Sequence, residues 1–241
     1  MGLRQSPVFK INEDLLTKGI KIHLYYTLFE DINNNPGSYD FSEAVIFPET
    51  KKITAKYTIE NIKDDPIIAA YREFYWKYMS IDPTKIRPSG EALIRRILQG
   101  KELPKINYFV DAYNWASAVS LIPIGAYDFD KFEGMIELRS ARLGEKFYAI
   151  GDKEVVLKGN ELITISEDDG TILSQFPYRD AEKTKVTENT TKILVTSLGI
   201  EHVSKDAIMN GINLTIDFLK RCNIPIKKDF QTLKPVYVTN F

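Results

Sequence analysis

The chain has 241 residues and a formal net charge of −1, and 44% of its residues are hydrophobic. These values are ordinary for a globular protein, and the balanced charge excludes a general attraction to polyanions, so nucleic acid would need a local basic patch. No apolar run approaches the roughly 18 residues that cross a bilayer, and the start has no signal-peptide core, so we expect a cytoplasmic protein without a membrane partner. The single Cys222 excludes an internal disulfide and a multi-cysteine zinc site, and we expect no metal and no cofactor.

The first part of the chain mixes strand and helix signals. Residues 7–11 and 21–29 have the β-branched and aromatic content of strands, with a helical turn between them and a loop over 32–40. From residue 64, apolar side chains recur every three to four positions, which predicts an amphipathic helix that ends near Asp82. Its aromatic residues are predicted to belong to the core and not to a base-stacking platform.

Two further helices are predicted in the centre of the chain. Ser89 is a candidate N-cap for a helix over 89–99 that Gly100 closes. Glu91 and Arg95 lie one turn apart in this helix, which indicates either a surface ion pair or a functional pair. A second helix over 111–121 ends before Pro123.

The sequence from residue 135 to 198 is typical of β structure. Six short segments are separated by turn residues, and Asp169-Gly170 is a strong hairpin signal, so we expect a sandwich or barrel-like sheet system. The helix predicted over 204–222 should pack across this core, and the tail can add an edge strand. We therefore predict an α+β fold, a β-sandwich-like core flanked by helices, in one domain over 1–241 with a strand-rich N-terminal region over 1–60.

No motif of a known nucleophile, zinc protease, P-loop or dinucleotide site occurs in the sequence. Polar residues instead interrupt apolar segments, and as a set they predict a pocket for a small polar ligand, although each alone can cap, turn or pair. None has an ordinary pKa suited to general base catalysis at neutral pH. Hydrolysis of an activated ester, by a positioned water and a stabilised oxyanion, would suit such a pocket.

One continuous phrase is more specific than packing requires. VDAYNWASAVSLIPIGAYDFDKFEGMIELRSARLGE, which begins at Val110, resembles the B3/B4 domain of the phenylalanyl-tRNA synthetase β subunit, a domain that removes wrongly attached amino acids from tRNA. The resemblance extends loosely over 89–198. RPSGEALIRRILQGKELPKINYFVDAYN is similar to free-standing B3/B4 proteins, so we expect a B3/B4 protein and not a complete synthetase.

The resemblance also implies a site. Asn114 matches the Asn of the family's editing pocket, whereas the family His falls on Gly125, the Gly-rich loop falls on PYRDAE, and the pocket Glu falls near Thr196. We expect Asp180, Asn114 and Thr184 to act in catalysis. The residues expected to bind substrate are Arg179, Gly125, Thr187, Thr196, Asp128 and Arg139, and those expected to bind RNA are Arg95, Arg96 and Lys101.

The leading hypothesis is a free-standing aminoacyl-tRNA deacylase that hydrolyses mischarged tRNA in trans, with aminoacylated tRNA as its partner. Two alternatives remain open at this stage. One is a tRNA or RNA-binding module without catalysis, because the family His and Glu are replaced. The other is a protein of the same fold that binds an amino-acid-like small molecule.

Overall fold

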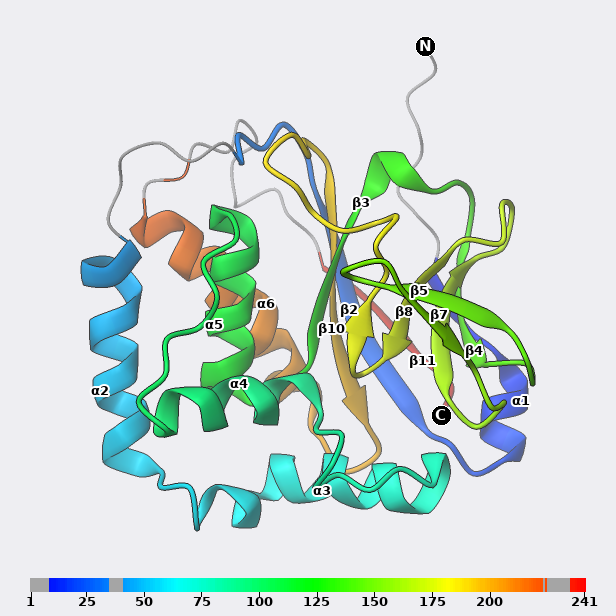
Figure 1. Cartoon of the computed structure of the whole chain (residues 1–241), viewed down its shortest axis with the longest axis horizontal. Helices are drawn as coiled ribbons and strands as arrows, with labels where there is room; N and C mark the ends of the chain where they lie inside the picture. The colour runs from blue at the N-terminus through cyan, green and yellow to red at the C-terminus, as the bar shows by residue number, and fades with distance from the viewer. Residues whose placement is uncertain (1–8, 35–40, 223, 225–234) are drawn as a thin grey trace.

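The computed structural model describes residues 9–34, 41–222, 224 and 235–241. Two sheets face each other in its centre (Figure 1). The five-stranded sheet has the order β1-β4-β7-β8-β9, the four-stranded sheet has the order β11-β2-β10-β3, and β5 and β6 form a separate ribbon. The strands are β1 Phe9–Ile11, β2 Ile22–Phe29, β3 Ile124–Asp128, β4 Ile136–Ser140, β5 Lys146–Ala149, β6 Lys153–Val156, β7 Leu162–Ser166, β8 Ile172–Phe176, β9 Arg179–Asp180, β10 Ile193–Ile200 and β11 Val236–Thr239.

Helices cover the face of the four-stranded sheet that points away from the five-stranded sheet (Figure 1). α5 and α6 pack on each other and on β3, β10 and β2, while α4 packs on α5. The helices are α1 Glu13–Thr17, α2 Phe47–Lys56, α3 Pro66–Phe74, α4 Ser89–Leu98, α5 Tyr108–Ser120 and α6 Lys205–Arg221, with short π or 3-10 segments η1 Ser42–Ile46, η2 Ile62–Asp64, η3 Tyr75–Met79 and η4 Phe129–Lys131.

Strand β10 explains why the protein has layers on both sides of the four-stranded sheet. All of its residues are buried, and successive side chains of a strand point to opposite faces. Leu194 and Leu198 belong to the apolar cluster between the two sheets, whereas Ile193 and Val195 belong to the cluster beneath the helices. A strand that is apolar on both faces requires a partner layer on each face.

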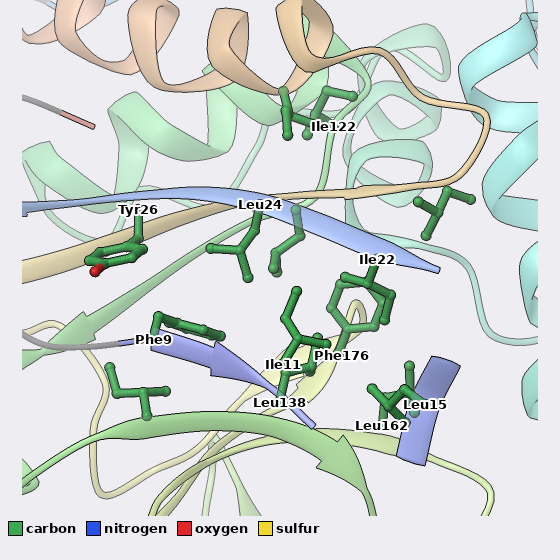
Figure 2. Packing of buried hydrophobic residues seen from close by; sticks show 14 of the residues in the cluster. Phe9, Ile11, Leu15, Ile22, Leu24, Tyr26, Ile122, Leu138, Leu162 and Phe176 are labelled. Carbon is green, nitrogen blue, oxygen red and sulfur yellow. The ribbon is translucent and has the colours of Figure 1, made fainter. Parts of the chain in front are cut away.

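The core between the sheets brings together side chains that are far apart in sequence (Figure 2). Phe9 and Leu138 of the five-stranded sheet face Leu24 of the four-stranded sheet, and Phe176 lies in the same cluster (Figure 2). Each fully buried side chain of this size contributes roughly 1.5–3 kcal/mol of transfer free energy. This packing fixes the relative position of β3 and β8, the strands that border the candidate site.

The α+β fold with a sandwich-like core is confirmed, and all six strands expected between 135 and 198 form. They do not share one sheet, because β5 and β6 pair only with each other and β10 joins the other sheet. The edge strand expected in the tail is confirmed as β11, which pairs with β2. Parts of the loop predicted over 32–40 and of the tail lie outside the described residues.

Three local expectations need correction. The expected strand-rich N-terminal region contains a helical segment over 42–56 that the sequence patterns missed. Ser89 is the first residue of α4 and not its cap, which is Pro88. The helix expected to end near Asp82 ends at Met79, where Ser80 adopts a left-handed conformation with φ 53°. None of the helices within the described ranges combines the length and apolarity needed to cross a bilayer.

Candidate functional site

A cavity of about 260 Å³ opens where the edge strands of the two sheets meet the helices. Strand β3 ends one sheet and β9 ends the other, and both border the cavity together with β8, α4 and α5. Its lining combines apolar side chains with polar ones, including Asn114, Gln175, Arg179 and Asp180. A concave, mainly apolar pocket with a few converging polar groups is the usual form of a small-ligand site.

Asp180 is the most unusual group in this pocket. Its backbone is fixed on two sides, by pairing with Ser174 of β8 and by a hydrogen bond from the Ile150 N–H to its carbonyl at 3.1 Å. Within the described ranges, no side chain or backbone group donates a hydrogen bond to its carboxylate. Desolvation by burial raises the pKa of Asp180 from 3.8 to about 7. The carboxyl group therefore exchanges protons near neutral pH, as a general base does.

Helix α5 brings Asn114 to the same pocket. The helix begins at its N-cap Asn107, whose side chain accepts a hydrogen bond from the Val110 N–H at 3.1 Å. The Asp111 carboxylate accepts a hydrogen bond from the Ile106 N–H at 2.9 Å, and burial raises its pKa to about 6. Asp111 thus orders the start of α5, and Asn114, one turn later, lines the pocket.

A glycine fixes the distance between α4 and the end of α5. A Cβ atom at Gly90 would lie 2.6 Å from the carbonyl oxygen of Leu121, closer than carbon and oxygen can pack. The absence of a side chain at Gly90 therefore lets α4 approach the end of α5 and close one wall of the pocket.

The hydroxyl groups of Tyr127 and Ser174 line the inner wall of the pocket. Thr196, which was expected to bind substrate, pairs with the lining residue Gly125 but does not line the pocket itself. The Tyr127 hydroxyl lies 2.9 Å from Ser174 Oγ, and the Thr196 hydroxyl donates to the Gly125 carbonyl at 3.4 Å. A Cβ at Gly125 would lie 2.8 Å from the Tyr127 hydroxyl. Burial raises the pKa of Tyr113 and of Tyr127, and the nearby Asp180 adds to both effects. Both tyrosines therefore stay protonated and can donate hydrogen bonds into the pocket.

Not all of the expected site residues reach the pocket. Asp128, Thr184 and Thr187 form a separate polar cluster in which the Asp128 N–H donates to the Thr184 carbonyl at 2.9 Å. The Thr190 hydroxyl donates to the Asp128 carboxylate at 2.8 Å and lies 3.3 Å from the Thr187 hydroxyl. The Thr184 hydroxyl is buried without a hydrogen-bond partner in the part of the chain that is described. These contacts tie the loop before β10 to the end of β3.

Arg139 also lies apart from the pocket. Its guanidinium donates to both carboxylate oxygens of Glu145, at 2.6 and 3.1 Å. Burial alone would raise the pKa of Glu145, but the hydrogen bonds from Arg139 and the Arg142 N–H lower it. The geometry of this pair closes the turn between β4 and β5.

The residues expected to bind RNA have different environments. Glu91 is fully buried, and Arg95 donates to it at 2.7 Å, so the pair is not the surface ion pair that the sequence allowed. Arg96 and Lys101 are exposed, and Arg96 also donates to the Glu102 carbonyl at 2.6 Å. Only the latter two are therefore available to a polyanion without breaking a buried contact.

A family model described as "B3/4 domain" matches residues 70–229, which include the whole pocket. The chain belongs to the B3/4 domain family. Its curated relatives include the phenylalanine–tRNA ligase β subunit of Mycoplasma pneumoniae, 34% identical over 76 residues, with 32% of this chain and 9% of that one covered. The β subunit from Streptococcus pneumoniae is 28% identical over 122 residues, covering 50% of this chain and 15% of that one. The chain thus spans a small part of these relatives.

Among solved structures, an N-terminal fragment of the phenylalanyl-tRNA synthetase β subunit from Pyrococcus horikoshii is similar to this chain with a TM-score of 0.49 and 15% identity. That likeness covers 99% of this chain and 52% of the fragment.

Several pocket residues of this B3/4 domain were missed from the sequence. Tyr113 and Tyr127 both lie within the phrase that carries the family resemblance, and Arg87 and Gln175 lie just before α4 and in β8. The sequence could have indicated the two tyrosines as pocket residues, because both lie in that phrase and Tyr113 directly precedes Asn114. No sequence pattern indicated that Arg87 and Gln175 would line the pocket. No group of three His, Cys, Asp or Glu side chains with the spacing of a metal site occurs among the described residues.

Proposed function

We propose that this B3/4 domain hydrolyses the ester between an amino acid and tRNA, acting in trans on a charged tRNA. The observation that carries the proposal is the pocket carboxyl of Asp180, which has a pKa of about 7 and lacks a partner in the described structure. The relatives are β subunits of phenylalanine–tRNA ligases, which supports a tRNA that carries an amino acid as the ligand. An aminoacyl ester is activated enough for a positioned water to attack it.

In the proposed mechanism, Asp180 acts as the general base. Its carboxylate takes a proton from a water molecule while the water oxygen attacks the ester carbonyl carbon. The side-chain amide of Asn114 donates a hydrogen bond to the carbonyl oxygen as negative charge develops there. The bond between the carbonyl carbon and the ribose oxygen then breaks, and the proton passes from Asp180 to that oxygen. The products are the free amino acid and uncharged tRNA.

The hydroxyl group of Tyr113 can donate a further hydrogen bond to the substrate in this mechanism. Tyr113 lines the cavity, and its raised pKa keeps it protonated as a donor. A pKa of about 7 leaves a large fraction of Asp180 ionised at pH 7 while keeping it basic enough to accept a proton.

The experiment is a deacylation panel with tRNAs that each carry a different amino acid. We expect rapid loss of the ester from one or a few species, and a loss of at least about 100-fold in rate in Asp180→Ala and a smaller loss in Asn114→Ala. Asp152→Asn, at an exposed carboxyl in a turn, is the matched control and should keep full activity. Full activity in both pocket variants would reject the proposed site.

A second function, binding of a free amino acid, is favoured by one observation. The same pocket holds the cationic Arg179 and the anionic Asp180, which is the charge pattern that complements a zwitterion. If this function is the correct one, a free amino acid raises the melting temperature by linkage, and charged tRNA stays intact in the presence of the protein.

A further inference from the structure

A cluster of arginines surrounds one buried carboxylate beside the pocket. Glu91 is fully buried, and its Oε1 lies 2.9 Å from Arg72 Nη1 and 2.7 Å from Arg95 Nε. Arg87 Nε lies 3.9 Å from the same oxygen. Three guanidinium groups thus share one carboxylate, so the cluster carries an excess of positive charge.

Arg87 is the member of this cluster that is left incompletely bound. Arg72 and Arg95 each make a direct hydrogen bond to Glu91, and Arg95 also donates to the Ile59 carbonyl at 3.1 Å. The distance from Arg87 to Glu91 exceeds a hydrogen bond, and its Nε is buried without a partner in the described part of the chain. Its side chain is 41% exposed and lines the pocket.

A second cation lines the same cavity. The Arg179 guanidinium lies 4.3 Å from the ring centroid of Tyr178 and donates to the hydroxyl of that tyrosine. Among the described residues, no carboxylate lies within ion-pair distance of Arg179. Stacking on an aromatic ring holds a guanidinium in place while leaving its remaining N–H groups free.

The lining of the pocket therefore carries groups of both charge signs. Arg87 and Arg179 contribute positive charge, whereas Asp180 contributes a carboxyl group that lacks a donor. When Asp180 is ionised it repels an anion, so a ligand with an anionic group binds best with that group against the arginines. Guanidinium groups bind phosphate oxygens through paired N–H donors.

We propose that Arg87 and Arg179 form an anion subsite that takes the phosphate of the terminal nucleotide, the one whose ribose carries the ester. This inference rests on the proposed function and assigns its substrate a second point of recognition. The ester then lies on the Asp180 side of the pocket and the phosphate on the arginine side, which orients the strand end.

The test compares the binding of adenosine 5′-monophosphate with that of adenosine, by calorimetry at low salt. We expect the wild-type protein to bind the monophosphate at least about tenfold more tightly, as a charged hydrogen-bonded contact provides. Arg87→Gln should reduce this preference to about that of adenosine, Arg87→Lys should keep part of it, and Arg142→Gln, at an exposed arginine, should keep all of it. An unchanged melting temperature shows that each variant is folded.

Equal binding of the two ligands, no binding of the monophosphate at millimolar concentration, or an unchanged preference in Arg87→Gln would overturn the subsite. Tighter binding of a free amino acid than of its amide, lost in Arg87→Gln, would instead assign the arginines to a carboxylate and also overturn it. The result does not decide the proposed function, because ester hydrolysis can persist without a phosphate preference, and a phosphate preference can persist without hydrolysis.

Discussion

The raised pKa of Asp180 predicts that this residue destabilises the folded protein at neutral and alkaline pH. The unfolded chain loses the Asp180 proton near pH 3.8, whereas the folded protein keeps it up to about pH 7. Between these values the folded state binds more protons, so stability falls as pH rises. About one pH unit above 7, Asp180 is ionised in both states and the loss of stability is complete.

The magnitude follows from the two pKa values. Each pH unit between them corresponds to about 1.4 kcal/mol, so the interval from 3.8 to about 7 gives a cost of up to about 4 kcal/mol. Asp180→Asn keeps the shape of the side chain and removes the charge. We expect it to raise the free energy of unfolding by about 2–4 kcal/mol at pH 8 and by less than about 1 kcal/mol at pH 4.

The assay is urea unfolding of the wild type and of Asp180→Asn at a series of pH values, with Asp152→Asn as the control. For a protein of this size, the expected gain at pH 8 corresponds to an increase in melting temperature of roughly 5–10 °C. A difference between the proteins that stays constant from pH 4 to pH 8 would refute the reasoning, because it would mean that Asp180 does not titrate in that interval.

Three further outcomes are expected. Arg139→Gln should lower the free energy of unfolding by about 1–3 kcal/mol, because the double hydrogen bond to Glu145 is lost. It should leave kcat/KM for deacylation unchanged. A large loss of activity without a loss of stability would place Arg139 at the substrate. Gly125→Ala should lower the free energy of unfolding, measured with denaturant, by about 1–3 kcal/mol, since its Cβ would lie 2.8 Å from the Tyr127 hydroxyl. Unchanged stability would show that the side chains of the pocket wall can move to make room. Reversing the charge of the exposed Arg96 and Lys101 should weaken tRNA binding and reduce the slope of log affinity against log salt by about 1 for each phosphate that the protein no longer neutralises; an unchanged slope would remove both residues from the RNA interface.

The regular elements were the part of the fold most open to sequence reasoning. The alternating strands around Asp169-Gly170 predicted the β7–β8 hairpin, in which Gly170 has a φ of 69°. The phrase around Asn114 predicted α5 and pointed to a pocket residue. These signals are local, so they depend little on the rest of the chain. The helical segment over 42–56 was missed because its polar composition gives a weak apolar face.

The pocket was harder to predict from the sequence, because its properties depend on contacts between segments that are far apart in the chain. Asp180 was identified as an acceptor, but nothing in the sequence indicated that burial would raise its pKa to about 7. The positions of Thr184 and Thr187 were expected at the pocket from their nearness to Asp180 in sequence. The chain turns away after β9, and hydrogen bonding to the end of β3 holds them elsewhere.

The most direct test of the account is the pH dependence of ester hydrolysis, measured for the wild type and for Asp180→Asn. The substrate is the charged tRNA that the wild-type protein hydrolyses fastest. If Asp180 is the general base, kcat/KM should rise about tenfold per pH unit below pH 7 and level off above it, in line with the pKa of about 7. The variant should show at least about 100-fold lower activity without that rise. Hydrolysis by Asp180→Asn at the wild-type rate, with the same pH profile, would contradict the central role of this residue.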